Sequence, residues 1–457
     1  MLPDDVLLEI FDIYVNKNEG ELFKRRIEKW QRLVHVCRRW RSVVFGSPRH
    51  LNLRLVCTSV TPARDTLDVW PSLPLLIRDI YLAKDDEILA VLERCDRVVG
   101  IDLYANLETV LAAMQVPFPE LTRLSLLSDD GMESDLPDSF LGGSAPRLEY
   151  LWLDRIPFPG LPKLLLSATH LVKVYLDDIP HSGYISPEAI VAVLSTLTSL
   201  EKLSLQFKSP LSRPDWANRR LPPPTRSVLP ILIYFSFKGA CEYLEDLVTC
   251  IDTPRLNELS ITLFNQIVFD TPQSIQFISR APTLRTFEKV HVVFGGDAAE
   301  VNLSSQSSGN GKLNMRIPCI ELDWQVSSME QVCTSCLPAL SALEGLYIYE
   351  NRYRPPVWKD NIENTLLLEL LRPFTGVKNL YLSKKFASLI IPALQELTGG
   401  RMTGVLPTLQ NIFLEEHQLS GTIQAGIQQF AAMRQVTSQP IAVSRWNNSK
   451  RDKNIWY

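Results

Sequence analysis

The sequence predicts an α/β protein in which a small all-helical module precedes a long array of alternating strands and helices. The first observation is a triplet of apolar residues spaced L-x-x-L-x-L, which recurs between residues 77 and 414 at intervals of about 28 residues. The second is that the segments between triplets show helical periodicity. The third is a pair of amphipathic segments before residue 45. Strands and helices that alternate at a fixed period favour a curved parallel sheet with the helices on its outer side.

Composition places the chain among ordinary globular proteins. Its residues are 46% apolar and 21% charged. At 457 residues, the chain is too long for one compact core and suits a large repetitive domain. The net charge of −4 gives no basic signal for nucleic acid, and no apolar run reaches membrane-spanning length. The eight Cys are scattered, and Asp4 and Asp5 stand where a signal peptide would carry positive charge. We therefore expect reduced thiols, a cytoplasmic and/or nuclear location, and no nucleic-acid or membrane partner.

Two amphipathic helices are expected at the N-terminus. The first opens at Leu2 and carries one broad apolar face, and the second covers residues 30–44 with one apolar stripe. These faces comprise Val6, Leu7, Ile10, Phe11 and Tyr14, and then Trp30, Leu33, Cys37, Trp40 and Val44. Two short helices do not make a self-sufficient core, so their apolar surface should meet either a partner or the rest of the chain.

The two helical segments also share an ordered set of short motifs: Leu2-Pro3, Val6-Leu7, Ile10-Phe11, Leu33, Val36-Cys37-Arg38, Trp40-Arg41 and Pro48. In this order the motifs resemble the F-box of fungal-type F-box proteins. This family's module binds the Skp-type adaptor of cullin-RING ubiquitin ligases, so the resemblance implies an F-box over residues 1–55. It places the adaptor contact at or near Leu2, Pro3, Ile10, Phe11, Leu33, Cys37 and Trp40. A charged insert at residues 17–29 and the short segment before Leu2 depart from the family pattern, and both should weaken adaptor binding.

The triplets predict about 13 irregular repeats over residues 56–437. They begin at residues 77, 98, 121, 148, 171, 200, 232, 256, 287, 317, 343, 377 and 409. They resemble leucine-rich repeats, and P-x-L precedes several of them, as at Pro119 and Pro254. The usual Asn of that family occurs only as Asn106 and Asn351, so uneven curvature is expected. A plain α/β domain with fortuitous triplets is the alternative.

Helices, loops and a tail complete the predicted array. Helices are expected at residues 86–95, 107–115, 187–197, 241–251, 272–279, 329–336, 364–371, 387–397 and 423–433. Ser186 and Thr271 are predicted N-caps because Pro follows each of them. A Pro-rich and Arg-rich loop is expected at 209–230, a mobile Ser-rich and Gly-rich loop at 301–314, and a basic C-terminal tail at 438–457.

One residue of each triplet should point away from the core. In an L-x-x-L-x-L strand this is the residue between the last two apolar positions. The predicted column is Tyr81, Asp102, Ser125, Trp152, Tyr175, Ser204, Ser236, Ser260, His291, Glu321, Tyr347, Tyr381 and Phe413. Its aromatic residues predict a substrate-binding surface at Trp152, Tyr175, Tyr347, Tyr381 and Phe413. The alternative is that aromatic residues are simply favourable in strands.

The sequence contains no pattern typical of catalysis. The six His have no metal-ligand spacing, no nucleotide-binding or nucleophile motif occurs, and Cys333 and Cys336 form a lone CxxC. No catalytic residue, cofactor or metal is therefore expected. The resemblance implies a non-catalytic substrate-recognition adaptor of a Skp–cullin–F-box ubiquitin ligase that binds an unknown protein substrate through its repeats. The alternative is a repeat scaffold without ligase association, and an enzyme is a third, weaker alternative.

Overall fold

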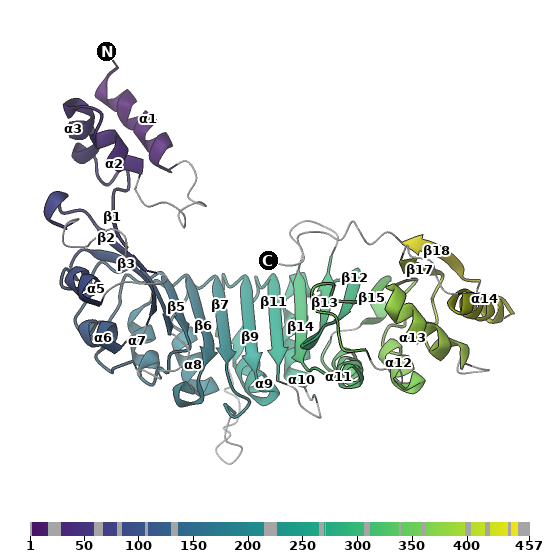
Figure 1. Cartoon of the computed structure of the whole chain (residues 1–457). Coiled ribbons are helices and arrows are strands. Elements are labelled where there is room, and N and C mark those ends of the chain that lie inside the picture. The colour runs from purple at the N-terminus through teal and green to yellow at the C-terminus, as the bar shows by residue number, and fades with distance from the viewer. Residues whose placement is uncertain are drawn as a thin grey trace. The chain divides into compact units, whose positions relative to one another are not determined.

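A computed structural model gives the structure of the chain (Figure 1). The chain divides into two compact α/β units. It describes residues 2–16, 29–58, 67–79, 85–105, 108–128, 136–213, 226–264, 269, 271–305, 311–337, 340–358, 362–397, 404–415, 421–436 and 440–446. The first unit comprises Met1–Ile185 with Thr196–Leu200, and the second Ser186–Ser195 with Glu201–Tyr457. Each unit combines a largely parallel sheet with helices, so the predicted α/β class is confirmed and is consistent with a leucine-rich-repeat-like solenoid.

Three short helices open the first unit: α1 (Asp4–Asn16), α2 (Lys29–Val34) and α3 (Arg38–Gly46). The predicted single helix over residues 30–44 is wrong, because the chain leaves the helix after Val34 and restarts at Arg38. Cys37 has extended backbone, and its sulfur accepts a hydrogen bond from the Trp40 N–H at 3.5 Å. Cys37 thus caps α3, which explains why the apolar periodicity continues across the break. The three helices bury Leu7, Phe11, Trp30, Leu33, Val34 and Val44.

The strands of the first unit pair in parallel and in chain order. They are β1 (Leu55–Cys57), β2 (Leu75–Asp79), β3 (Val98–Ala105), β4 (Arg123–Ser128), β5 (Tyr150–Asp154) and β6 (Lys173–Ile179). The helices between them are α5 (Asp85–Leu92), α6 (Glu108–Ala113) and α7 (Leu161–Ser167), with short 3-10 turns at Phe140–Gly143 and His181–Gly183. The triplet residues, such as Leu124 and Leu126, are buried as predicted.

The register of the first predicted triplet is wrong by three residues. Ile77 pairs with Ile101, so Ile77 takes the second position of its repeat, and Arg78 stands beside Asp102 in the outward column. Tyr81, the predicted column residue, lies outside the described residues. The strand β1, which the triplet pattern did not predict, pairs with β2. A run of apolar residues from Leu73 to Ile77 offered two possible triplet frames, and spacing alone did not distinguish them.

The strands of the second unit pair in the order β7-β9-β11-β14-β13-β12-β15-β16-β17-β18. They are β7 (Lys202–Phe207), β9 (Tyr234–Gly239), β11 (Glu258–Leu263), β12 (Lys289–Phe294), β13 (Ala298–Ser304), β14 (Lys312–Pro318), β15 (Gly345–Glu350), β16 (Asn379–Leu382), β17 (Asn411–Glu415) and β18 (Ala442–Trp446). A separate parallel pair joins β8 (Ser227–Val228) to β10 (Ile251–Asp252). The strand β8 lies within the predicted loop at 209–230, of which residues 214–225 lie outside the described part.

The helices of the second unit follow its strands at the repeat period. They are α8 (Pro187–Leu194), α9 (Cys241–Cys250), α10 (Pro272–Arg280), α11 (Leu322–Ser335), α12 (Asn364–Leu371), α13 (Lys384–Gln395) and α14 (Gly421–Val436), with 3-10 turns at Pro282–Leu284 and Leu340–Ala342. The Ser186 hydroxyl accepts from the Ala189 N–H at 3.3 Å and confirms the predicted N-cap. Thr271 does not cap α10 through its side chain. Glu245 from α9 instead accepts the Gln273 and Ser274 N–H groups, each at 2.8 Å.

A β-hairpin interrupts the parallel order of the second unit. The strand β13 pairs antiparallel with both β12 and β14, so the expectation of an entirely parallel sheet is wrong. The hairpin occupies the predicted mobile loop at 301–314, of which only 306–310 lies outside the described residues. Buried Val301 and Leu303 alternate with polar residues on β13, which is a strand pattern that the Ser and Gly content obscured. Gly311 supports close packing, because a side chain there would collide with the Thr283 carbonyl.

The hairpin also displaces one predicted repeat and one predicted column residue. The triplet expected at residues 317–322 is not a strand triplet, because Ile320 is exposed and Glu321 occupies the N-cap position of α11. In the outward column, Ser260 is followed by Asn314 and then by Asn302. The sequence predicted His291 and Glu321 at these two positions. At the C-terminal end, residues 442–446 of the predicted basic tail form β18 and belong to the sheet.

Candidate functional site

The helix α1 carries apolar residues on two sides. Leu7 and Phe11 point into the helical core, and Phe11 packs against Trp40 with ring centroids 4.8 Å apart. Other apolar side chains on α1 and just before it are 39% to 60% exposed, and we call them the open face of α1: Leu2, Val6, Ile10, Ile13 and Tyr14. The broad apolar face that periodicity predicted therefore divides into a buried half and an open half.

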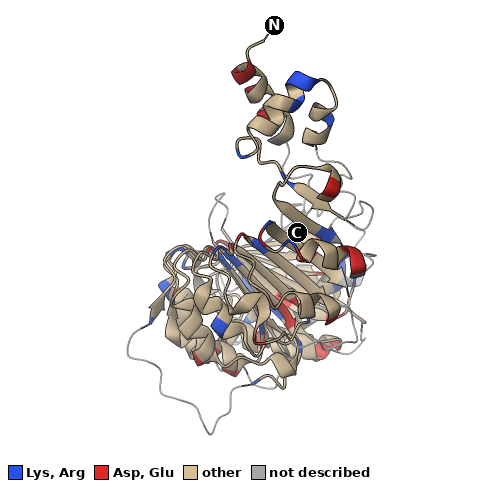
Figure 2. Cartoon of the chain, turned by 90° about the vertical axis from the view of Figure 1, so that its left-hand side faces the viewer, with Lys and Arg blue, Asp and Glu red and all other residues tan. Residues whose placement is uncertain are grey.

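Ion pairs and ring contacts hold the helices in place around this face. Arg39 on α3 pairs with Asp4 on α1 at 2.7 Å and also donates to the Leu2 carbonyl, which fixes the start of α1. Trp30 packs edge-on against Trp70 at 5.1 Å, and its indole N–H donates to the Arg54 carbonyl at 3.0 Å. The buried side of the helices thus packs on the chain that follows, as one alternative expected. Acidic residues lie on α1 and basic residues on α2 and α3 (Figure 2).

The predicted adaptor-binding residues separate into two groups. Leu2, Pro3, Ile10 and Cys37 are exposed and Trp40 is half-buried. Phe11 and Leu33 are buried, so the structure places them in the helical core and not on the surface. Sequence reasoning did not select Ile13 and Val36, which are 60% and 58% exposed. Val6 and Ile13 lie two helical turns apart and therefore on the same side of α1. This spacing was the signal in the sequence for the open face.

A row of stacked rings crosses the sheet of the second unit. The register places His291, Tyr347, Tyr381 and Phe413 side by side on β12, β15, β16 and β17. Successive ring centroids are 4.4, 4.1 and 4.4 Å apart, with interplanar angles of 11°, 6° and 8°. We call these four residues the aromatic ladder. Three of the predicted substrate-binding residues, Tyr347, Tyr381 and Phe413, are therefore brought together.

Two further aromatic residues contact the ladder. The Tyr349 hydroxyl lies 3.3 Å from His291 Nδ1. The Trp446 ring on β18 meets Tyr347 and Tyr381 edge-to-face, with centroids 5.7 and 5.5 Å away. Tyr347 is half-buried, and this burial together with the neighbouring Tyr381 raises the pKa of its phenol well above the ordinary value. Trp446 was assigned to a tail by the sequence, and only strand pairing reveals its position.

The ladder continues on the other side of His291 as a polar row. Asn302 pairs with His291 and Asn314 with Asn302, and the Ser260 hydroxyl donates to Asn314 Oδ1 at 3.3 Å. Ser204 and Ser236 follow in register and are buried. In the strand order of the second unit, the outward row is thus polar from β7 to β13 and aromatic from β12 to β17. The predicted column has the same polar and aromatic parts.

The first unit has its own aromatic group. Trp152 and Tyr175, the other two predicted substrate-binding residues, are neighbours in the register of β5 and β6. Tyr175 also contacts Tyr150, with ring centroids 5.7 Å apart, and the Arg123 guanidinium lies 3.8 Å from the Tyr150 ring centroid. Burial raises the pKa of Tyr150. The five predicted residues therefore lie in two separate groups, one in each unit.

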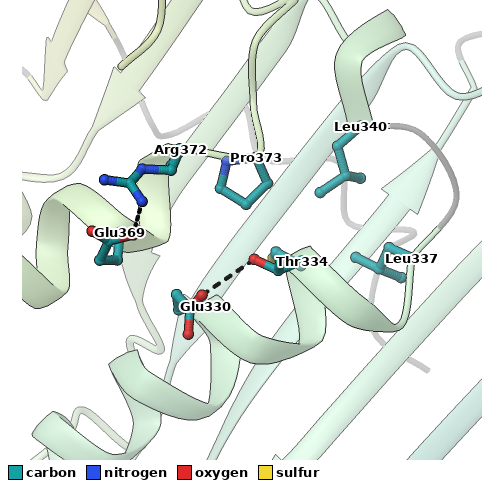
Figure 3. A pocket seen from close by; sticks show the side chains of 8 residues that line it. Glu330, Thr334, Leu337, Leu340, Glu369, Arg372 and Pro373 are labelled. Carbon is teal, nitrogen blue, oxygen red and sulfur yellow. Dashed lines mark hydrogen bonds and ion pairs between the residues drawn. The ribbon is translucent and has the colours of Figure 1, made fainter. Parts of the chain in front are cut away.

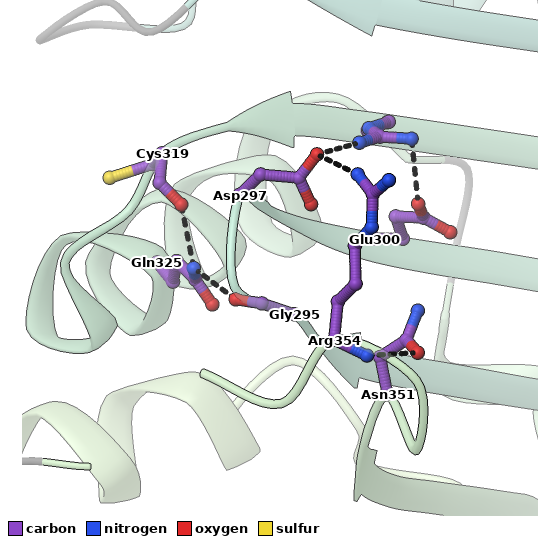
Figure 4. A network of polar contacts seen from close by, with 8 residues as sticks. Gly295, Asp297, Glu300, Cys319, Gln325, Asn351 and Arg354 are labelled. Atoms are coloured by element: carbon purple, nitrogen blue, oxygen red, sulfur yellow. Dashed lines mark hydrogen bonds and ion pairs between the residues drawn. The ribbon is translucent and has the colours of Figure 1, made fainter. Parts of the chain in front are cut away.

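A polar network surrounds the turn between β12 and β13 (Figure 4). Asp297 receives Arg316 at 3.0 Å and Arg354 at 3.6 Å, and Arg316 also reaches Glu300 at 3.4 Å. Buried Gln325 donates to the carbonyls of Gly295 and Cys319 at 2.8 and 2.6 Å. Within the described residues, Glu300 Oε2 and Gln325 Oε1 are buried without a hydrogen-bond partner. The contacts that are made tie the turn to β14 and α11, so we assign the network a structural role.

A hollow between α11 and α12 has a volume of about 370 Å³ (Figure 3). Its polar groups pair with one another, because Thr334 donates to Glu330 at 3.2 Å and Arg372 pairs with Glu369 at 2.8 Å. Burial raises the pKa of the Cys333 thiol in its wall, which keeps that sulfur protonated and unreactive. Within the described residues, no group of three or more His, Cys, Asp and Glu could hold a metal ion, and no helix is long and apolar enough to cross a membrane.

Comparisons with known proteins assign the chain to no family. No protein-family model matches it, and no curated protein matches it. Among solved structures, the chain is similar to the crystal structure of LegL7, a leucine-rich repeat-containing protein from Legionella pneumophila. The two share 12% sequence identity and a TM-score of 0.27, and the match covers 83% of this chain and 98% of that chain. A similarity at this level carries no argument about function.

Proposed function

We propose that this protein is the substrate-recognition subunit of a Skp–cullin–F-box ubiquitin ligase in the cytoplasm or nucleus. Residues 1–55 would act as an F-box that binds the Skp-type adaptor, and the sheet surface of the repeats would bind a target protein. The protein itself would perform no catalysis. Its contribution would be proximity, because holding a target beside the ligase raises the effective concentration of its lysines near the ubiquitin-loaded enzyme.

The open face of α1 is the observation that supports this proposal most directly. A row of apolar side chains 39% to 60% exposed on an ordered helix is typical of a protein-binding surface, because burying such side chains in an interface removes apolar area from water. The core of the helical module is already filled by Phe11, Trp30 and Leu33, so the open face is not needed to stabilise the helices.

Binding of the Skp-type adaptor to the full-length chain tests the proposal. Ile10→Asp with Ile13→Asp should weaken adaptor binding by about 1,000-fold, since two interface anchors contribute about 2 kcal/mol each. Unfolding should change little, because both residues are exposed. Val69→Asp is the matched control, since Val69 is 72% exposed and lies outside the helices α1 to α3.

The outcome of the wild-type measurement separates the two candidate functions. If the wild-type chain does not bind the adaptor, the ligase proposal fails, and a repeat scaffold without ligase association is favoured. If the double variant binds as tightly as the wild type, the open face of α1 is not the adaptor contact.

Target capture tests the second half of the proposal. Proximity labelling in cells should identify proteins captured by the wild-type chain, and Tyr347→Ser, Tyr381→Ser and Phe413→Ser together should abolish their capture while adaptor binding remains. Tyr353→Ser provides the control, because Tyr353 is 97% exposed and does not belong to the ladder. Unchanged capture by the triple variant would remove the ladder from the target-binding surface.

A further inference from the structure

The last strand of the second unit is held differently from the strand beside it. On β17, Ile412 and Leu414 are buried, whereas the first four residues of β18 are all exposed. Among the described residues, β18 pairs in parallel with β17, including a hydrogen bond from the Ala442 N–H to the Gln410 carbonyl at 2.8 Å, and the ring of Trp446 packs on Tyr381. Few buried side chains mean that this strand contributes little apolar burial and can open at low cost.

Trp446 lies across the aromatic ladder and not beside its own partner strand. It pairs with Glu415 on β17, yet its ring contacts Tyr381 on β16 and Tyr347 on β15. The interplanar angles of 64° and 70° are close to the edge-to-face arrangement that aromatic rings prefer. The chain therefore places one of its own aromatic side chains on the surface that the proposed function assigns to a target.

The chemistry of β18 indicates which ligand this surface accepts. Backbone pairing with a strand edge is nearly independent of sequence, and side-chain pockets then supply the selectivity. Val443, Ser444 and Arg445 are exposed, so the selectivity of this segment resides in Trp446. An extended segment with an aromatic residue at the position of Trp446 can both pair with the strand edge through its backbone and place a ring on the ladder.

We propose that the edge of β17 and the aromatic ladder form a binding site for an extended peptide segment carrying an aromatic anchor, and that β18 is its built-in competitor. A partner segment adds to β17 as a parallel strand, and its aromatic side chain replaces Trp446 on Tyr347 and Tyr381. The inference rests on the proposed function only in taking the ladder as the target-binding surface.

Binding of a synthetic peptide with the sequence of residues 440–446, labelled at its N-terminus, tests this inference. Fluorescence anisotropy would compare the full-length wild type with full-length Trp446→Ala. The tethered strand competes at an effective concentration of about 1 mM, so the variant should bind the peptide at least about tenfold more tightly. A peptide in which Ala replaces the Trp should not bind, and adding Tyr381→Ser to the Trp446→Ala chain should abolish binding.

A second variant releases β18 by a different route. Ala442→Pro removes the N–H that donates to Gln410 and leaves the Trp446 side chain intact, so it should also increase peptide binding. Trp324→Ala is the control, because Trp324 is 54% exposed on α11 and should leave peptide binding at the wild-type level.

Two results would overturn the inference. One is peptide binding by Trp446→Ala and Ala442→Pro no tighter than by the wild type, with circular dichroism showing both variants folded. The other is equal binding of the Trp and Ala peptides. Adaptor binding by the same proteins reports separately on the proposed function: retained adaptor binding with no peptide binding refutes this inference alone, and peptide binding without adaptor binding refutes the ligase proposal alone.

Discussion

The open face of α1 and the aromatic ladder differ in how their apolar side chains are covered. On α1, Ile10 and Ile13 are 46% and 60% exposed, and within the described residues no ring contact covers Tyr14. On the ladder, each ring stacks on its neighbour at 4.1 to 4.4 Å, and Trp446 covers two of them. Both surfaces are rich in apolar residues, but only the ladder is covered by its own chain.

This difference separates two kinds of binding surface. A partner of α1 gains the whole apolar area of the open face, because nothing has to be displaced first. A partner of the ladder must first replace ring contacts that the chain already makes, so its net gain is smaller and its selectivity higher. Substitutions on the buried and open sides of α1 should differ most in their effect on the free energy of unfolding.

The largest expected effect compares Phe11→Ala with Ile10→Ala on α1. Phe11 is 1% exposed and packs on Trp40, so its truncation should lower the free energy of unfolding of the helical module by about 3–5 kcal/mol. Ile10 is exposed, and its truncation should change that free energy by no more than about 0.5 kcal/mol. Urea unfolding followed by circular dichroism measures both, and equal losses would show that the open face belongs to the core.

The repeat architecture was largely readable from the sequence. Apolar side chains at the triplet positions, such as Leu124 and Leu126, are buried because strand periodicity fixes which face they occupy. The helix predicted at residues 364–371 matches α12. The hairpin at β13 and β14 was missed, because Gly311 and the polar residues around it were taken as signs of mobility, whereas Gly311 permits close packing against Thr283.

The candidate site was predicted residue by residue but not as an assembly. The spacing rule placed Tyr347, Tyr381 and Phe413 on one face, and in the structure their rings stack on one another. The triplet rule could not find Trp446, because β18 carries no buried triplet and is placed by backbone pairing with β17 and by the ring contacts of Trp446 itself. Phe11 and Leu33 were selected by resemblance to a motif, and a motif does not distinguish residues that support a surface from residues that form it.

An intermediate effect is expected from pairs of substitutions in the ladder. Tyr347 and Tyr381 stack directly, so a double-mutant cycle with Tyr347→Ala and Tyr381→Ala should give a coupling of about 0.5–1.5 kcal/mol in unfolding free energy. Tyr347 and Phe413 are separated by β16, and their coupling should be smaller, close to zero. Equal couplings for the two pairs would mean that the stacking geometry does not contribute to stability.

The smallest expected effect is a pH dependence of stability that originates at Tyr347. Burial is the main cause that raises the folded-state pKa of this phenol above its value in the unfolded chain, and Tyr381 is the second cause. The folded state therefore holds the proton more tightly, so this contribution to stability is complete below the unfolded-state pKa near 10 and is lost as the pH rises above it. Between about pH 8 and about pH 10.5, the wild type should lose more unfolding free energy than Tyr347→Phe, which has no phenol to ionise at this position. Tyr381→Phe should lose an intermediate amount, because it removes the second cause of the shift and leaves burial in place. Identical pH slopes for the wild type and Tyr347→Phe would show that the ladder is as open to water as a surface tyrosine.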